Sequence, residues 1–335
     1  MLGVHEPATT IRDVAVQAGV SIATVSRVLN DRADVSVETR ERVREVARSV
    51  GYSADPAARG LVTQRTQLVA VVVGDNAGHR DLSLLFFGKV MAAVSRRLAV
   101  AGIDALLLQE LDVAPQHRFD AAILIGVDGN DPLVTELWTR SVPLVGVDVR
   151  VGGRRTAFVG SDHREGMRLA LAHLHKLGHR RIAHVAGARN TVAGADRIAA
   201  FLRETAQLGL ALPDGYVREA DFSSAGGYRE TRALLELDER PTAVVAASDL
   251  MALAALQAIR DAGLEPGRDV AVVGFDDLEA AALAHPPLTT IRQDRAKLGV
   301  VAAERALELI EHTETTPPET ILPVELIVRS STAGV

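Results

Sequence analysis

From residue 67 onward the chain alternates short, continuously apolar runs with stretches of helical periodicity. Apolar runs separated by helices are typical of parallel strands whose two faces are both covered by helices. Seven such runs over about 210 residues indicate two doubly wound lobes. The runs are residues 68–73, 105–108, 121–125, 144–147, 182–186, 243–247 and 270–273. The helical stretches are residues 88–101, 164–177, 196–207, 225–236 and 250–262.

Sheets of this kind bind ligands beyond the carboxyl ends of their strands. The polar residues at these places are Asp75 with Asn76, Asp148, Asp162 at the start of the next helix, Ser248 with Asp249, and Asp276 with Asp277. Arg197, near the start of a helical stretch, adds a guanidinium, and Phe222, in a loop, adds an aromatic face. This combination suits a sugar-like polyol, which is bound by paired hydrogen bonds and stacking. The alternative is that each Asp only caps the helix after it.

Residues 9–30, TTIRDVAVQAGVSIATVSRVLN, have the pattern of two short helices separated by a glycine. Thr10 is the expected N-cap of the first helix, and Gly19 ends it in the left-handed conformation. Ser21 caps the second helix, and a third follows Ser36. Three short helices with small inner faces predict a compact bundle that contains a helix-turn-helix motif.

The outer face of the second helix has side chains suited to a DNA groove. Arg27 has the fork that donates two hydrogen bonds to guanine, and Ile22 and Ala23 suit thymine methyl groups. Short donors suited to phosphate oxygens accompany them. These are Ser21, Thr24, Ser26 and Asn30. The alternative is a generic helical hairpin with a solvated face.

Residues 51–66 predict a short linker helix, because Asp55 can cap it and Pro56 suits its first position. So short a helix is marginal in water, and Gly60 weakens it by about 1 kcal/mol relative to alanine. We expect it to be folded only in the presence of a partner.

Several motifs resemble the lactose repressor family. DVAVQAGVSIATVSRVLN, VSVETRERV and GYSADPAARGL resemble its amino-terminal segment in order and spacing. GSDHREGMRLALAHLHKLGHRRIAHVAG, RPTAVVAASDLMALAALQAIRDAGL, RDVAVVGFDDLE and HPPLTTIRQD resemble its effector-binding core. The resemblance implies that Ile22, Ala23 and Arg27 read bases. It also implies that the linker helix folds on DNA and inserts Leu61 into the minor groove.

The resemblance further implies a core similar to periplasmic sugar-binding proteins, with two lobes joined by three crossovers. The positions that line the effector cleft in this family are occupied here by Asp148, Arg197, Phe222, Ser248, Asp276 and Gln293. The chain departs from the family where Ser248 replaces a frequent Asn or Asp and where His163 replaces a common Asn. The usual motif after the first strand is also missing, so the amino-terminal half of the cleft is not specified.

Composition restricts the class of protein. The 335 residues exceed one ordinary domain, and 47% hydrophobic with 24% charged residues indicates a soluble, globular chain. Cysteine is absent, which excludes disulfide and thiol chemistry. We expect neither a signal peptide nor a membrane span. Residues 1–66 hold nine Arg and eight acidic residues (+1), and the remainder holds 28 basic and 35 acidic residues (−7). DNA binding must therefore depend on a few placed residues and on dimer symmetry.

Catalytic and metal sites are weakly indicated. Asp276 and Asp277 are adjacent, so at a strand end they point to opposite sides and do not form an acid–base pair. His175 and His179 have helical spacing, but Gly178 interrupts the helix between them. No nucleophile elbow or phosphate loop occurs. We therefore predict no enzymatic activity, no cofactor and no metal.

These observations predict an all-α helix-turn-helix head joined to an α/β core of two doubly wound, parallel-sheet lobes, like a periplasmic binding protein. The expected parts are a head of residues 1–52, a hinge and linker of 53–66, an amino-terminal lobe of 67–160 plus 292–322, and a carboxy-terminal lobe of 161–291 plus 323–335.

The predicted function is an effector-controlled repressor of carbohydrate-related genes. It would bind a pseudo-palindromic double-stranded DNA operator as a homodimer and be released by a sugar-like inducer, although the sequence is equally compatible with a corepressor. We expect it in the cytoplasm, associated with the nucleoid and not with a membrane. The alternative is a cytoplasmic small-molecule-binding or hydrolytic protein with a vestigial DNA-binding head.

Overall fold

The computed structural model describes residues 9–29, 34–52, 65–73, 85–108, 119–128, 131–311 and 318–333. The chain divides into two compact units, Met1–Gln67 and Leu68–Val335. Each unit has its own hydrophobic core and is considered separately. None of the described helices has the length and apolar character needed to cross a bilayer.

The first unit contains the three predicted helices, α1 (Ile11–Ala18), α2 (Ile22–Leu29) and α3 (Val37–Ser49). Local chemistry fixes where α1 begins and ends. The Asp13 carboxylate accepts hydrogen bonds from the backbone N–H of Thr10 at 2.8 Å and from its hydroxyl at 2.7 Å. Gly19 ends the helix with φ of 64°, a conformation that glycine adopts without steric cost.

The inner faces of the three helices meet in one small core. Its fully buried members are Val14, Val25, Val28 and Val43. Because α2 contributes Val25 and Val28 to this core, the orientation of its opposite face is fixed by packing.

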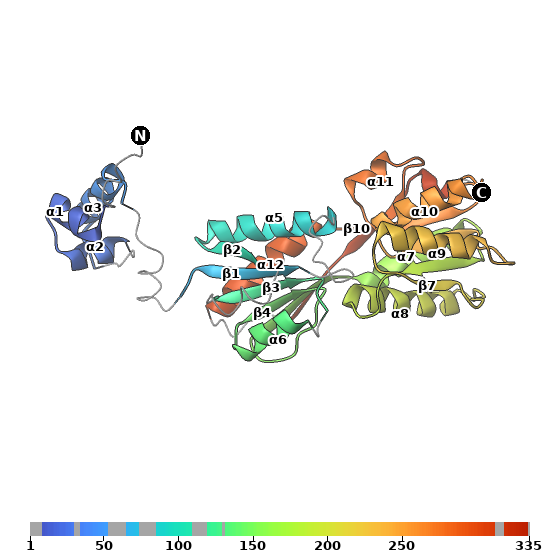
Figure 1. Ribbon diagram of the computed structural model, residues 1–335, viewed down its shortest axis with the longest axis horizontal. Coiled ribbons are helices and arrows are strands. Elements are labelled where there is room, and N and C mark those ends of the chain that lie inside the picture. Colours follow the sequence, from blue (N-terminus) through green and yellow to red (C-terminus); the bar gives the residue numbers. More distant parts are fainter. Residues whose placement is uncertain are drawn as a thin grey trace, which may run out of the picture. The chain divides into compact units, whose positions relative to one another are not determined.

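The second unit, the core of the protein, contains two six-stranded sheets (Figure 1). The first sheet has the strand order β11-β5-β4-β3-β1-β2, and every neighbouring pair is parallel. Its strands are β1 (Leu68–Val73), β2 (Asp104–Leu108), β3 (Ala121–Ile125), β4 (Leu144–Val147), β5 (Thr156–Ser161) and β11 (Glu319–Leu322). Helices α5 (Leu85–Val100) and α12 (Arg295–Ile310) cover one face, and α6 (Pro132–Thr139) covers the other (Figure 1).

The second sheet has the order β12-β10-β9-β8-β6-β7, with only β12 antiparallel to its neighbour among the described strands. Its strands are β6 (Ile182–Ala186), β7 (Val217–Glu219), β8 (Ala243–Ala246), β9 (Ala271–Asp276), β10 (Thr289–Gln293) and β12 (Val324–Ile327). Helices α7 (His163–Lys176) and α8 (Val192–Gln207) pack on one face. Helices α9 (Ser224–Leu235) and α10 (Asp249–Asp261) pack on the other. The short helices α11 (Glu279–Leu283) and η2 (Ser330–Thr332) complete this lobe.

The chain passes between the two lobes three times, at residues 161–163, 293–295 and 322–324. The first crossover joins β5 to α7, the second joins β10 to α12, and the third joins β11 to β12. Each spans only a few residues, so the crossovers tie the lobes together at one place.

All seven apolar runs coincide with strands to within a few residues, but five of the described strands lie outside these runs: β5, β7, β10, β11 and β12. Strand β10, with the sequence TTIRQ, shows why. Only Ile291 in it is apolar, whereas Thr289 and Thr290 are fully buried because their hydroxyls donate to the Arg329 carbonyl (2.9 Å) and to Asp249 (2.5 Å). A strand that is buried through tertiary hydrogen bonds has no apolar pattern to recognise.

Candidate functional site

The face of α2 that was predicted to read DNA projects away from the core of the head. Ile22, Ala23 and Arg27 are exposed, and the Arg27 side chain is 58% accessible beside an equally exposed Asp34 at 3.6 Å. Thr24 and Ser26 are half-buried at the edge of the same face. A long cationic side chain and small apolar side chains therefore project from one face of a helix, as recognition in the DNA major groove requires.

Ser21, Asn30 and Leu61 complete the predicted DNA-contacting set. The Ser21 hydroxyl accepts a hydrogen bond from the Thr24 backbone N–H at 3.0 Å, so this side chain forms the N-cap that the sequence predicts. Its oxygen also lies 2.9 Å from the Thr24 hydroxyl. Asn30 and Leu61 fall outside the described residues.

In the core, a buried polar chain joins the two lobes. Asp148 follows β4 of the first lobe, His163 opens α7 and Arg197 lies on α8 of the second. His163 Nε2 lies 3.1 Å from Asp148 Oδ1, and its Nδ1 lies 3.4 Å from both Nε and one terminal nitrogen of Arg197. All three residues are buried. One neutral tautomer satisfies both contacts, with Nε2–H donating to Asp148 and Nδ1 accepting from Arg197.

The Arg197 guanidinium is held on every side. Its carbon lies 3.7 Å from the centre of the Phe275 ring, and its other terminal nitrogen donates to the Ala247 carbonyl. Burial lowers the pKa of Arg197, whereas the negative charges of Asp276 and Asp148 act to raise it. A cation–π contact and nearby carboxylates thus compensate for the loss of water.

Asp276 and Gln293 lie beside this chain, at the carboxyl ends of β9 and β10. Gln293 Nε2 donates to Asp276 Oδ1 at 2.6 Å, while the buried Gln293 Oε1 has no hydrogen-bond partner among the described residues. Burial raises the pKa of Asp276 to about 6, although Arg197 and Gln293 oppose the rise. Burial and the neighbouring charge of Asp276 raise the pKa of Asp249 to about 7. The pair therefore titrates near neutral pH.

The structure brings four of the predicted effector residues together in one buried cluster, which we call the inter-lobe cluster. The four predicted members are Asp148, Arg197, Asp276 and Gln293, and His163 is the fifth member of the cluster. Ser248 is also buried, and its hydroxyl caps α10 by accepting from the Met251 N–H at 3.3 Å. Phe222 is half-buried, and its ring packs on Gly187 so tightly that a Cβ at this position would overlap the ring. Asp75 falls outside the described residues.

The capping alternative is correct for some carboxylates and not for others. Asp162 and Asp294 do cap α7 and α12, accepting from backbone N–H groups at 2.9 Å. Asp148 and Asp276 instead accept from side chains, and both have positive φ, of 53° and 131°. Backbone conformations that are unfavourable for non-glycine residues are concentrated at functional sites. The position after a strand could not by itself separate the two roles.

Sequence reasoning missed one member of this region, Phe275, and did not include Asp249 or His163 among the predicted effector contacts. Asp249 is fully buried, accepting hydrogen bonds from the Thr290 hydroxyl and from the Leu278 N–H at 2.7 Å. Phe275 supplies the ring under Arg197 from inside an apolar strand, where nothing in the pattern marks it. His163 was noted only as a departure from the family. The signal that was available was its position at the start of the helix that follows a crossover.

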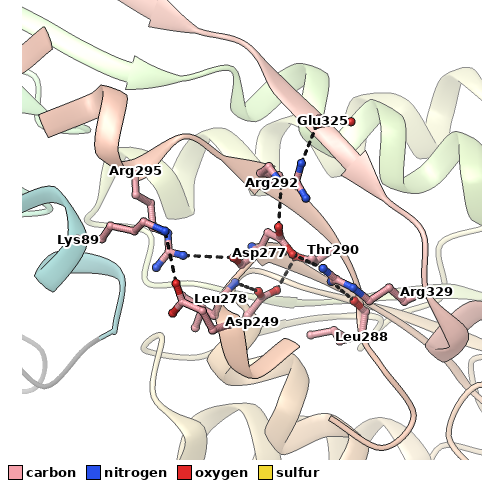
Figure 2. A network of polar contacts seen from close by, with 11 residues as sticks. Lys89, Asp249, Asp277, Leu278, Leu288, Thr290, Arg292, Arg295, Glu325 and Arg329 are labelled. Atoms are coloured by element: carbon pink, nitrogen blue, oxygen red, sulfur yellow. Dashed lines mark hydrogen bonds and ion pairs between the residues drawn. The ribbon is translucent and has the colours of Figure 1, made fainter. Parts of the chain in front are cut away.

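A second polar network surrounds Asp277, the residue after Asp276 (Figure 2). Its carboxylate accepts hydrogen bonds from Arg292 of β10 at 2.8 Å and from Arg329 at 2.6 Å. Its backbone carbonyl accepts from Arg295 of α12 at 3.2 Å. Burial acts to raise the pKa of Asp277, but the hydrogen bonds from both arginines outweigh it and hold that pKa below its usual value. Adjacent aspartates thus serve the inter-lobe cluster and the second crossover.

Further polar contacts cross between the lobes near the cluster. Lys89 of α5 pairs with Glu279 of α11 at 3.4 Å, and Asn190 donates to Asp128 at 2.9 Å. Both contacts are exposed, so each contributes little on its own. Across the described residues, no group of three or more His, Cys, Asp or Glu side chains is arranged to hold a metal ion.

A helix-turn-helix head and a two-lobed core of the binding-protein type, with a polar cluster between its lobes, together define a class of DNA-binding regulator. Residues 10–55 match the bacterial regulatory proteins of the lacI family, and residues 171–332 match a periplasmic binding protein-like domain. The chain is 35% identical to the HTH-type transcriptional regulator CelR of Thermobifida fusca, over 96% of this chain and 98% of that relative. It is 32% identical to the lactose operon repressor of Escherichia coli, over 96% and 90%. The chain therefore belongs to the lacI family, whose members are regulators and not enzymes.

Solved structures agree with this assignment. The lac repressor dimer bound to operator and the anti-inducer ONPF superimposes with a TM-score of 0.82 and 30% identity, over 97% of this chain and 99% of that one. The CelR–cellobiose complex gives a TM-score of 0.74 and 32% identity, over 96% and 99%. The predicted fold, head and core included, is thus confirmed.

Proposed function

We propose that this regulator is a repressor whose hold on its operator is controlled by a sugar-like effector bound at the inter-lobe cluster. The observation that carries the proposal is the contact between Asp148 of one lobe and His163 of the other, extended by Arg197. A solute that replaces or strengthens this link changes the relative stability of the two lobe arrangements. Effector and DNA affinities are then coupled, typically by about 1–3 kcal/mol.

The proposed DNA contacts follow from the exposed face of α2. Arg27, Ile22 and Ala23 would read base edges in the major groove, and Leu61 would enter the minor groove. The proposed phosphate contacts are Ser21, Thr24, Ser26 and Asn30. A homodimer would place two heads on the half-sites of a pseudo-palindrome, an arrangement supported by the lac repressor dimer bound to its operator.

The proposed effector contacts come from both lobes and comprise Asp75, Asp148, Arg197, Phe222, Ser248, Asp276 and Gln293. The cellobiose complex of CelR supports a carbohydrate as the effector class. The proposed parts of the chain remain a head (1–52), a hinge (53–66), and lobes formed by 67–160 plus 292–322 and by 161–291 plus 323–335. We further propose a cytoplasmic protein that associates with the nucleoid.

Selection from a random pool of DNA duplexes tests the DNA-binding half of the proposal. We expect the full-length protein to enrich one pseudo-palindromic site and to bind it several thousand-fold more tightly than random duplex at physiological salt, since specific and non-specific affinities typically differ by about 10³–10⁷. If the protein enriches no site but binds or hydrolyses glycosides, the alternative function is supported, namely a small-molecule-binding or hydrolytic protein with a vestigial DNA-binding head.

A further inference from the structure

The exposed face of the head contains an ion pair between the proposed base-reading arginine and an aspartate outside α2. Arg27 Nε lies 3.6 Å from Asp34 Oδ2. Arg27 is in the last turn of α2, whereas Asp34 lies in the turn that leads into α3. In the part of the chain that the structure describes, Asp34 is the only partner of the Arg27 side chain. The carboxylate therefore engages Nε and leaves both terminal nitrogens of the guanidinium open.

The backbone on which each of these two side chains stands is held in place by packing. Arg27 extends from α2, which buries two valines in the core of the head. Asp34 is followed by Val35, which packs on the same core, and by Ser36, the N-cap of α3. The distance between the two attachment points is therefore set by the fold of the head.

The contact between Arg27 and Asp34 contributes little to the stability of the free protein. The two side chains are 58% and 60% exposed, and ion pairs between exposed side chains are weak because water screens them. DNA that covers α2 displaces this water, and the attraction between opposite charges grows as the effective dielectric constant falls. The contact therefore matters more in the DNA complex than in the free protein.

The geometry of the pair favours one mode of DNA contact and opposes another. Guanine is recognised when two N–H groups of one arginine donate to O6 and N7, and the open terminal nitrogens of Arg27 supply them while Nε stays on Asp34. A phosphate contact would instead draw Arg27 away and leave the Asp34 carboxylate unpaired beside the negatively charged DNA backbone. The head has little charge to offset this repulsion, because residues 1–66 carry a net charge of only +1.

We propose that Asp34 determines the specificity of DNA recognition by holding Arg27 through Nε in the orientation that binds guanine and by disfavouring the use of Arg27 on phosphate. The inference rests on the proposed base contact of Arg27 and goes beyond it. Asp34 is a positioning residue, since it acts on DNA through Arg27. Its removal therefore lowers the ratio of specific to non-specific affinity.

Binding of the full-length protein to its selected operator, to single-base variants of that operator and to random duplex tests the proposal. The base pair read by Arg27 is the one at which Arg27→Ala loses its preference. We expect Asp34→Ala to lower the preference at that base pair by about three- to tenfold, a part of the roughly 5–150-fold that one arginine–guanine contact provides. We also expect Asp34→Ala to bind random duplex more tightly than wild type does. Its affinity should depend more steeply on salt, by about 0.9 in the slope of log affinity against log salt, if the released Arg27 gains one phosphate contact.

A control and a double variant separate the positioning role from a general effect of charge. Glu45→Ala also removes one exposed acidic side chain of the head, and its partner Arg48 is exposed as well, so we expect base preferences and salt dependence as in wild type. The double variant Arg27→Ala/Asp34→Ala should have the base preferences of Arg27→Ala alone, because Asp34 then has nothing to position. Selection of the same operator by each variant shows that its head is folded.

Two results would overturn the proposal while leaving operator binding in place. One is an Asp34→Ala variant that keeps the wild-type preference at every base pair. The other is an effect of Asp34→Ala that adds to that of Arg27→Ala at a different base pair, which would mean that the carboxylate contacts a base itself, as a carboxylate can at the cytosine amino group. A wild-type protein that selects no operator would overturn the proposed function, and the inference with it.

Discussion

At the scale of single residues, Arg27 is the side chain on which sequence recognition depends most. It stands exposed on α2, whose position is fixed by the buried Val25 and Val28. We expect Arg27→Ala to cost about 1–3 kcal/mol of operator affinity and to relax specificity at one base pair. Binding measured on a panel of single-base operator variants tests this. Arg48→Ala, which removes an exposed cation from α3, is the matched control. An equal loss of affinity for every operator variant would mean that Arg27 contacts phosphate.

Asp249 gives a second prediction at this scale, for stability against pH. Its pKa in the folded protein is raised to about 7, chiefly by burial, so between the unfolded value and pH 7 the native state binds more protons than the unfolded chain. Stability from this group is therefore complete at low pH and is lost as the pH rises through 7. His184, whose pKa burial lowers to about 4, has the opposite effect below pH 6.5.

The comparison of wild type with Asp249→Asn tests the Asp249–Asp276 pair, because the His184 contribution is common to both proteins and the variant also removes the Asp249 charge that acts on Asp276. Asn can donate to the Thr290 hydroxyl and accept from Leu278, so the local geometry is retained. We expect the melting temperature of wild type, relative to that of the variant, to rise when the pH is lowered from 8 to 5. Parallel melting curves for the two proteins across that range would show that Asp249 titrates as an exposed carboxyl does.

At the scale of elements, Asp277 connects β9, β10, α12 and the segment after β12 (Figure 2). We expect Asp277→Ala to lower the free energy of unfolding by about 2–3 kcal/mol, because hydrogen bonds to charged groups are worth about 1.5–3 kcal/mol and the exposed Arg292 loses less than the half-buried Arg329. Glu325→Ala, which removes a more exposed partner of the same Arg292, should change it by no more than about 0.5 kcal/mol. Urea unfolding with equal effects for both variants would exclude this role for Asp277.

Helices and strands were predictable from the sequence where their apolar residues form a continuous or periodic pattern. Strands β1, β3, β4 and β6 are continuous apolar runs, and helix α1 has its cap, stripe and terminal glycine in sequence. Strand β10 was missed because tertiary hydrogen bonds bury its threonines, and β12 runs antiparallel, which no local pattern records.

The candidate site was predictable in part for a similar reason. The positions after strands identified Asp148 and Asp276, but the same reasoning chose Ser248, whose hydroxyl caps a helix. The central position of His163 arises where two lobes meet, and the local sequence records only that His163 lies at the start of a helix. The strained backbone of Asp276, at φ of 131°, is likewise visible only in three dimensions.

At the scale of the whole molecule, three short crossovers and the inter-lobe cluster join the two lobes. The first crossover leads directly into His163, and the second lies between Gln293 and Arg295. A ligand that contacts Asp148, Asp276 and Gln293 therefore acts on residues of both lobes and next to two connections. Because linkage is reciprocal, what the effector does to DNA affinity, DNA must do to effector affinity.

The most direct measurement is the operator affinity of the full-length protein with and without a saturating sugar that calorimetric titration shows to bind. We predict that the sugar changes the dissociation constant by about 5–150-fold, which corresponds to the coupling of about 1–3 kcal/mol, and that Asp148→Asn reduces the change. An operator affinity that is identical in the empty and the saturated protein would contradict control of DNA binding by the inter-lobe cluster.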